Sequence, residues 1–492
     1  MRLGVLRSRV AREAGVYLFG TVLNRIFPFL LLPLYTRAMS PVEFGKWGYA
    51  MAILQALFIV GDLGLNAATT RLFYEEEGAE KRSDFLFVSF LTRIATVLGA
   101  GLLLAPIMGL SWGLVTGNEL ALMPFLPLLI GCMIVQGIVS FNLASARATR
   151  NPAQFIRIQV SQSVIQAAAS AALVLAGWGA AGPLWGFLVG GAATAAVVGW
   201  LFVKAHPPHG PLDWSQPGRL LGYGVKFVPT AATLWLKRLA DRIIIGRLLT
   251  MIDLAVYQVA ASGIAPLVIL LGSFNSAYLP YFYEQRRSGN ADLNRLAEID
   301  TIIVAALALI VTGTMMIGPE LVRILAPASY GAAAVLIPPL VLTAFLGGAA
   351  LQFNKEILFH KRPGIVSTVT TIPALVAVAA NVVLIPALGI AAAAWAGAAA
   401  SALTLVGSVV AMRRLEHTPH RFGLIFAICA ITAAAALVFA LLSDLPPFAM
   451  TSIAYRGSVG LLFAGAVLLA ALPSALALAS RRRRPAAPAT GE

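Results

Sequence analysis

The sequence predicts an all-α membrane protein that crosses the bilayer with about fourteen transmembrane helices. Hydrophobic residues make up 59% of the 492 residues and charged residues only 12%, and the mean hydropathy is +0.84. A soluble domain carries roughly 25% charged residues. The apolar residues occur in runs long enough to cross a bilayer as helices. Alternating segments of about ten residues, which would indicate an outer-membrane barrel, are absent.

Each predicted span contains about 20 mostly apolar residues. We expect spans at residues 16–38, 45–66, 85–110, 119–141, 154–177, 183–204, 221–248, 253–280, 300–318, 333–354, 364–386, 389–412, 422–442 and 454–479. Several arginines precede the first span, as in a signal peptide. Its apolar stretch is longer than the roughly 7–15 residues of a signal sequence, so we interpret it as a retained helix.

The basic residues orient these spans. If the N-terminus is cytoplasmic, 26 of the 36 Lys and Arg residues fall in cytoplasmic tails, loops and helix ends, five fall at the outer side and five lie within spans. This bias follows the positive-inside rule. Because one missed helix would invert the alternation downstream, the distribution supports both the count and two cytoplasmic termini.

Short segments recur at an offset of about 210 residues, which predicts two homologous halves. Residues 36–47 (TRAMSPVEFGKW) match residues 246–257 (GRLLTMIDLAVY), and residues 179–185 (GAAGPLW) match residues 389–395 (GIAAAAW). Between them, LFYE and YFYE, then RNP and KRP, recur in the same order. Two halves of six spans share one orientation. We expect a pseudo-two-fold axis along the membrane normal and a site at the interface of the halves.

The repeat divides the chain into four expected parts. These are an N-terminal lobe over residues 1–210, a C-terminal lobe over residues 211–415, two extra helices over residues 416–480 and a basic tail over residues 481–492. The four arginines that begin the tail are expected to bind anionic membrane lipids on the cytoplasmic side.

Several classes of function find no support in the residues. The net charge of +15 would suggest nucleic acid in a soluble protein, but here it follows the membrane topology, so no nucleic-acid partner is expected. Cys132 and Cys429 lie in apolar runs and are expected to act as small hydrophobes. No GxxxxGK[ST] phosphate loop, metal constellation or cofactor motif occurs. The five histidines, His420 among them, are expected to be solvated in cytoplasmic loops. Short outer loops argue against an enzyme.

The N-terminal segment LNRIFPFLLLPLYTRAMSPVEFGKWGYA, then DLGLNAATTRLFYEE, and later LADRIIIGRLLTMIDLAVYQVA carry a resemblance that covers nearly the whole chain. They resemble O-antigen (Wzx-type) polysaccharide flippases of the multidrug/oligosaccharidyl-lipid/polysaccharide exporter superfamily. Met39 stands where that branch usually has Leu. The resemblance implies a two-lobed transporter in the bacterial inner membrane that works by alternating access.

The cargo that the resemblance implies is an undecaprenyl-diphosphate-linked oligosaccharide, moved from the cytoplasmic to the periplasmic leaflet. A polysaccharide polymerase and other export proteins are implied partners. In lipid II flippases the two extra helices line a groove for a lipid tail. The resemblance leaves open whether the last two helices of this chain have the same role. The alternatives are a cation-coupled drug or metabolite exporter of the same superfamily and a non-transporting partner of a polysaccharide synthase.

The seventh predicted span carries the densest group of intramembrane charges: Lys237, Arg238, Asp241 and Arg242. At 100° per residue they share one face, and Asp241 can pair with Lys237 or Arg238. The remaining charge of about +2 suits a diphosphate, to which arginine offers paired donors. Alternatively, the group fixes helix packing or extends to the outer interface.

Two further charges lie near the middle of predicted spans. Arg25, beside Asn24, is expected to line the substrate cavity or to pair with Asp62. Asp62 is the one isolated acid within the first lobe's spans. It is a candidate site for coupling to a proton or sodium ion, and the alternative is a structural pair.

Four arginines near span ends are candidate gates. Arg71 is expected at the cytoplasmic mouth of the cavity, either as a gate or as a membrane anchor. Arg93 is expected either to contact the substrate or to extend to the cytoplasmic surface. Arg37 and Arg247 occupy equivalent positions in the two halves. We expect them to form a structural cap that closes the outer side.

Overall fold

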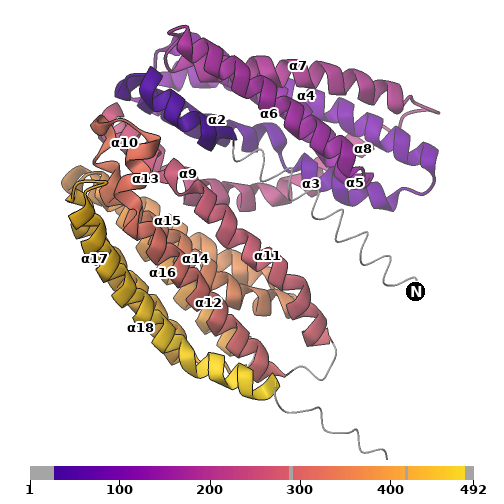
Figure 1. The fold of residues 1–492 in the computed structure, drawn as a ribbon. Helices are drawn as coiled ribbons and strands as arrows, with labels where there is room; N and C mark the ends of the chain where they lie inside the picture. The colour runs from indigo at the N-terminus through magenta and orange to yellow at the C-terminus, as the bar shows by residue number, and fades with distance from the viewer. Residues whose placement is uncertain (1–26, 288–291, 416–418, 483–492) are drawn as a thin grey trace, which may run out of the picture. The chain divides into compact units, whose positions relative to one another are not determined.

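The computed structural model of the chain describes residues 27–287, 292–415 and 419–482, and this part is helical without strands. It divides into two compact units, residues 1–258 and residues 259–492, and each is described by itself. Residues 27–38 are helical. The first unit continues with α2 (Pro41–Asp62), α3 (Leu65–Leu72), η1 (Phe73–Glu75), α4 (Ala79–Thr116), α5 (Leu122–Ala148), α6 (Pro152–Leu175), α7 (Ala181–Ala205), α8 (Gln216–Gly224), η2 (Val225–Phe227) and α9 (Val228–Leu248), as Figure 1 shows.

Helix α10 (Met251–Gly263) contains the boundary between the units. The second unit then holds α11 (Ala265–Arg287), α12 (Leu293–Met316), α13 (Gly318–Leu325), η3 (Ala328–Tyr330), α14 (Ala333–Phe359), α15 (Pro363–Leu388), α16 (Ile390–Leu415), α17 (Phe422–Leu441), η4 (Leu442–Asp444) and α18 (Met450–Arg482). Helix α14 is its central helix, since α11, α12, α16 and α17 all pack against it. The last two helices, α17 and α18, pack on α12 and so belong to this unit.

Among the described residues, twelve helices are long and apolar enough to cross a membrane, with α10 and α11 counted together. The all-α membrane fold predicted from the sequence is thereby confirmed. Two of the fourteen predicted spans are not among these twelve helices. The first begins among residues that the structure does not describe, and the seventh corresponds to α9, whose charges keep it outside this set.

The sequence repeat recurs in how the equivalent helices begin. Ser40 caps α2 by accepting a hydrogen bond from the backbone N–H of Glu43 (3.3 Å). At the equivalent point before α10, Thr250 Oγ1 accepts from Asp253 N–H, and Asp253 Oδ2 accepts from Thr250 N–H, both at 3.1 Å. Caps of this kind satisfy N–H groups that the first helical turn leaves without partners.

Two more pairs of turns share a backbone conformation that side chains rarely adopt. Arg150 (φ 53°) and Lys361 (φ 57°) lie two residues before α6 and α15, which both begin at proline. Gly179 (φ 53°) and Gly389 (φ 68°) precede α7 and α16. The repeated letters therefore mark repeated turns, which is the physical reason why they recur.

Helix α2 breaks beside the cavity described below. Leu63 (φ 44°) and Gly64 (φ 71°) are left-handed, and α3 starts directly after them. Gly64 lies so close to α8 that a Cβ atom there would overlap the carbonyl oxygen of Gly224. The break therefore depends on a glycine for both its conformation and its packing.

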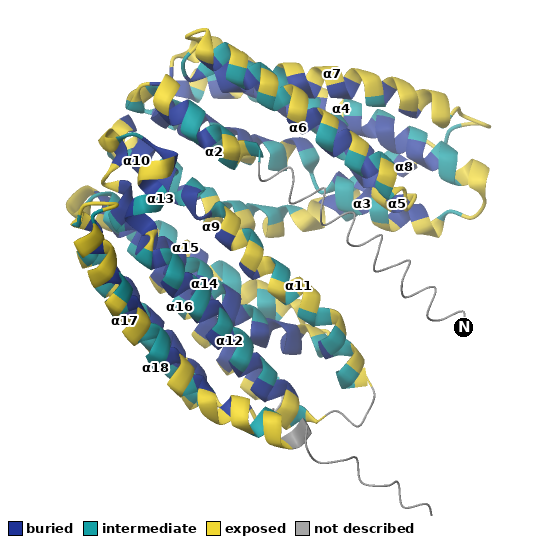
Figure 2. Cartoon of the chain, in the orientation of Figure 1, coloured by how far each residue is buried: buried dark blue, intermediate teal, exposed yellow. Residues whose placement is uncertain are grey.

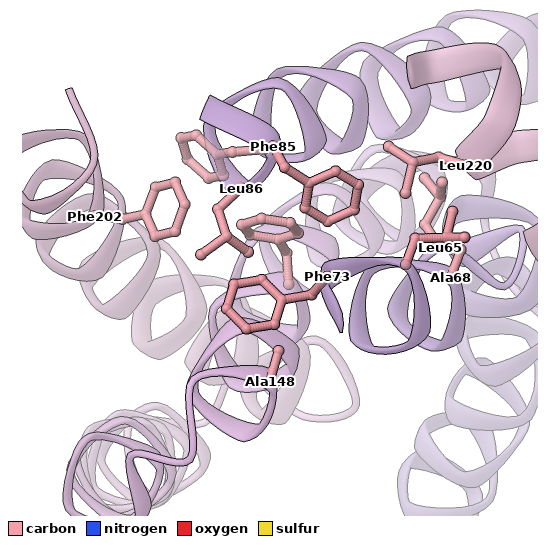
Figure 3. Packing of buried hydrophobic residues seen from close by; sticks show 11 residues of the cluster. Leu65, Ala68, Phe73, Phe85, Leu86, Ala148, Phe202 and Leu220 are labelled. Atoms are coloured by element: carbon pink, nitrogen blue, oxygen red, sulfur yellow. The ribbon is translucent and has the colours of Figure 1, made fainter. Parts of the chain in front are cut away.

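A buried apolar cluster holds the elements around this break in place (Figure 3). It draws residues from α3, η1, α4, α5, α7 and α8: Leu65, Ala68, Leu72, Phe73, Phe85, Leu86, Phe90, Phe141, Ala148, Phe202 and Leu220. Within it the rings of Phe90, Phe141 and Phe202 contact one another, with centroids 4.9 to 5.4 Å apart. Such contacts give α3 and α8 fixed positions relative to the long helices.

Large apolar side chains are exposed along the outer helices of both units (Figure 2). Leu110 of α4 is 92% exposed, and Leu461 of α18 is 75% exposed. Surfaces of this kind are unfavourable in water, whereas lipid tails solvate them. The exposed leucines therefore mark faces that contact lipid.

Replacing Gly64 by Ala is expected to lower the free energy of unfolding by about 3 kcal/mol, because backbone strain and overpacking add. Gly78→Ala is the matched control, since Gly78 also has a positive φ (89°) but has open space around it. Thermal unfolding in detergent should show a clearly larger loss for Gly64→Ala. Equal losses would show that the contact with Gly224 carries no cost.

Candidate functional site

A polar cavity of about 410 Å³ lies within the first unit, beside the break between α2 and α3. Helices α2, α3, α4 and α5 supply its polar lining: Gln55, Asp62, Asn66, Arg93, Gln136 and Ser140. Phe227, Val228 and Ala231 add an apolar wall. Polar side chains are costly within membrane spans, so their collection around one cavity indicates a functional site.

Arg93 is the most buried charge of this cavity, with a side-chain exposure of 0%. Its Nη2 donates to Asp62 Oδ1 (2.7 Å) and Asn66 Oδ1 (3.0 Å), and its Nη1 donates to the backbone oxygens of Gly61 (3.1 Å) and Asp62 (3.4 Å). The last carbonyls of a broken helix need such donors. Arg93 therefore holds the end of α2, and the expectation that it extends to the cytoplasmic surface is wrong.

Asp62 is the accessible partner of this pair, since 31% of its side chain is exposed. The sequence left open whether Asp62 pairs with Arg25, and the structure pairs it with Arg93 from α4. Arg25 and Asn24 lie outside the described residues. Asp62 thus presents a carboxylate to the cavity while the buried guanidinium holds it in place.

A second cavity, of about 590 Å³, is lined by Asn66, Ala67, Thr70, Arg71, Tyr74 and Arg147. Asn66 and Ala67 of α3 line both cavities, so the two adjoin each other at this helix. Arg71 is 57% exposed and pairs with Glu75 (3.1 Å), and the guanidinium of Arg147 lies 5.7 Å from the ring centre of Phe155. Two arginines at one cavity form a site that can attract an anion.

The charges of α9 divide into two pairs. Lys237 and Arg238 are exposed, whereas Asp241 and Arg242 are partly buried. Asp241 accepts a hydrogen bond from the hydroxyl of Tyr257, and Arg242 Nε donates to Gln258 Oε1 (2.6 Å). Both partners lie on α10, so Asp241 and Arg242 link α9 to α10.

The two arginines predicted as gates at the outer side donate hydrogen bonds to backbone oxygens. Arg37 Nη1 donates to Pro33 O (3.1 Å) within its own helical segment. Arg247 Nη1 donates to Gly113 O (3.2 Å) near the end of α4. Arg247 therefore joins α9 to α4, as a capping role requires.

One prediction about the histidines is wrong. His420 was expected to be solvated, but its side chain is fully buried between two carboxylates of the second unit.

Three residues that line the cavities were not predicted as site residues: Asn66, Gln136 and Arg147. The first two are polar residues inside apolar runs, which is the signal that could have found them. In residues 27–287, 292–415 and 419–482, no group of His, Cys, Asp and Glu is arranged to hold a metal ion.

Comparisons with known proteins agree on family and fold. Residues 10–285 match the family described as polysaccharide biosynthesis protein. Protein 1 of the Lsg locus of Haemophilus influenzae is 25% identical over 348 residues, which cover 63% of this chain and 75% of that protein.

Two solved structures share the fold. The lipid II flippase MurJ in an inward closed conformation has a TM-score of 0.71 at 13% identity, covering 95% of this chain and 99% of that one. An inward-facing multidrug resistance MATE family transporter of the MOP superfamily has a TM-score of 0.60 at 13% identity, covering 82% and 95%. At these identities the similarity concerns the fold.

Proposed function

Because the chain belongs to the polysaccharide biosynthesis protein family, we propose that it is a flippase for an undecaprenyl-diphosphate-linked oligosaccharide. It moves this lipid from the cytoplasmic to the periplasmic leaflet by alternating access and so serves surface polysaccharide synthesis. It acts as a transporter rather than an enzyme, in the bacterial inner membrane, with both termini in the cytoplasm. A polysaccharide polymerase is the partner that would use its product.

The observation that supports this proposal best is the pair of adjoining cavities at α3. A diphosphate carries about two negative charges and favours paired guanidinium donors, which Arg71 and Arg147 supply. Sugars need neutral hydrogen-bonding groups, and Gln55, Asn66 and Gln136 line the adjoining cavity. Together these groups suit an anionic head group that carries a neutral or acidic glycan.

The charged face of α9 adds to this proposal. Lys237 and Arg238 are exposed to solvent, while Asp241 and Arg242 are partly buried and contact α10. We therefore assign substrate contact to Lys237 and Arg238 first, together with Arg25 and Asn24. Arg37 and Arg247 act as caps at the outer side.

Removing both charges of the second cavity tests the function. The double variant Arg71→Gln/Arg147→Gln is expected to lower surface polysaccharide export at least about tenfold, which corresponds to 1.4 kcal/mol of lost interaction. Export is measured in cells that carry this variant as their one copy, together with its amount in the membrane. Arg157→Gln, an exposed arginine of α6, is the matched control and should leave export unchanged. Normal export in the double variant would contradict the proposal.

A cation-coupled drug or metabolite exporter is the second candidate, favoured by the partly exposed carboxylate of Asp62 in a polar cavity. In that case deletion would raise drug susceptibility and leave polysaccharide export intact. Asp62→Asn would reproduce the deletion. A flippase gives the opposite pattern, so one set of strains separates the two functions.

A further inference from the structure

A second group of buried charges lies within the second unit, far along the chain from both cavities. It consists of Arg286 on α11, Asp300 on α12, Lys355 and Glu356 on α14, and His420 two residues before α17. We call these five residues the Asp300 cluster. The side chains of Asp300, Glu356 and His420 are 0% exposed, and those of Lys355 and Arg286 are 1% and 7% exposed. The proposed transport function assigns no role to them.

The other four residues of the cluster are two basic and two acidic groups, and they pair with one another. Lys355 forms an ion pair with Asp300, and Arg286 lies 3.4 Å from Glu356. Buried charges are tolerated when they are paired in this way. The protonation of His420 therefore decides whether the cluster carries a net charge of zero or +1.

His420 lies between the two carboxylates. Its Nδ1 is 3.8 Å from Asp300 Oδ2, and its Nε2 is 3.9 Å from Glu356 Oε1. A neutral imidazole carries one N–H group, whereas a protonated imidazole can donate from both nitrogens. Asp300 Oδ2 is buried and faces the ring. Only the protonated ring can serve both carboxylates.

The helices near the imidazole carry further titratable and charged groups. The titratable and charged groups are Arg286 and Tyr278 of α11, Glu298 and Asp300 of α12, Lys355 and Glu356 of α14, Arg413 of α16, and Arg421 next to His420. Arg421 pairs with Glu298 at 3.7 Å, and the rings of Phe353 and Phe422 enclose the imidazole at 5.4 and 5.7 Å. The carboxylates of Asp300 and Glu356 both lie within 4 Å of a ring nitrogen.

We propose that Asp300, Glu356 and His420 form a proton-binding site, and that the bound proton anchors the start of α17 to α12 and α14. One proton from solvent adds to the imidazole and no other bond changes. Attraction to the two carboxylates opposes the cost of burying a charged imidazole and the repulsion from Lys355 and Arg286. At this site the attraction outweighs both costs, so the folded protein binds the proton more tightly than the unfolded chain does and releases it as the pH rises above neutrality.

The proposal has a direct structural consequence for α17. At low pH the proton joins the segment before α17 to two neighbouring helices, and at high pH this link is lost. Since stability rises as pH falls wherever the folded state binds more protons, α17 should open less often under acidic conditions. Cys429, a buried residue of α17, is a natural reporter of such opening. Cys132 is the one other cysteine and can be removed.

The test uses the full-length Cys132→Ala protein in detergent and measures how fast N-ethylmaleimide labels Cys429. The labelling rate is measured for the Cys132→Ala parent and for the double variant Cys132→Ala/His420→Gln. Dividing the second rate by the first at each pH cancels the intrinsic pH dependence of the thiol. We expect a ratio of about tenfold at pH 5.5 that falls toward one at pH 8.5. His209→Gln is the matched control, because His209 also lies beside an acid (3.3 Å from Asp84) but is exposed in the first unit. Its ratio should stay near one.

A ratio for His420→Gln that does not change with pH would overturn the proposal. If His420→Gln fails to fold, the parent protein still decides the matter. It contains five histidines, so ¹³C-histidine NMR with assignment from variants of the other four isolates the signal of His420. We expect a protonated ring at pH 5.5 and a neutral ring at pH 8.5, whereas one unchanged state across this range refutes the site.

Discussion

Replacing Arg93 by Met is expected to lower the free energy of unfolding by about 3 kcal/mol and to abolish polysaccharide export. The side chain is fully buried and donates to four oxygen atoms at the break between α2 and α3. Truncating one partner of a buried ion pair costs roughly 3–5 kcal/mol. We take the lower end because 31% of the Asp62 side chain is exposed and water can solvate it.

The measurement is unfolding of the purified protein in detergent, together with export in cells. Arg157→Met, an exposed arginine on α6, is the control and should change stability by less than about 0.5 kcal/mol. Arg93→Lys should be intermediate, since an ammonium cannot reach both backbone carbonyls and both side chains. A stable Arg93→Met protein would show that α2 ends at Asp62 without help from this side chain.

Asp62→Asn separates structure from function at the same pair. The amide can still accept a hydrogen bond from Arg93, so the fold should persist while the negative charge in the cavity is lost. If Asp62 binds a coupling ion, export falls although the protein remains stable. If Asp62 only positions Arg93, export and stability change together.

The helical repeat was predictable because its signals are local. Ser40 and Thr250 each precede a helix, and each side-chain oxygen accepts from the backbone N–H of the acid three residues later, so similar letters encode similar turns. The apolar runs likewise predicted the spans, because bilayer thickness fixes their length. Helix α4 runs longer than expected, from Ala79, because its first turn of Glu80, Lys81 and Arg82 extends the helix beyond the apolar stretch.

The site was less predictable because its contacts join distant segments. Asp62 and Arg93 were both recognised as charges within spans, but their pairing depends on how α2 packs against α4. The burial of His420 is not visible in HTPH, a sequence typical of a loop. It arises because the start of α17 packs between α12 and α14, where Asp300 and Glu356 already lie. Tertiary packing decided these two cases.

Replacing Lys355 by Met is expected to cost about 3–5 kcal/mol, because it leaves the carboxylate of Asp300 buried without its cation. Both side chains are at most 1% exposed, so water gives no compensation. Lys355 also lies over the rings of Tyr278 (4.2 Å) and Phe282 (4.8 Å), and these cation–π contacts are lost as well.

The double variant Lys355→Met/Asp300→Asn should recover much of this loss, because no unpaired charge then remains. Equilibrium unfolding of the parent, Lys355→Met, Asp300→Asn and the double variant gives the coupling energy between the two residues. We expect this energy to be at least about 2 kcal/mol. Independent effects of the two substitutions would contradict a paired, buried site.

The single variant Lys355→Met also tests the proton-binding site at His420. Without Lys355 the cluster carries one more negative charge, which favours a protonated imidazole. In the Lys355→Met protein, the pH at which Cys429 labelling changes should therefore move upward from that of the parent. A loss of stability with no movement of this pH would place Lys355 in the packing of α14 and not in the electrostatics of the proton site.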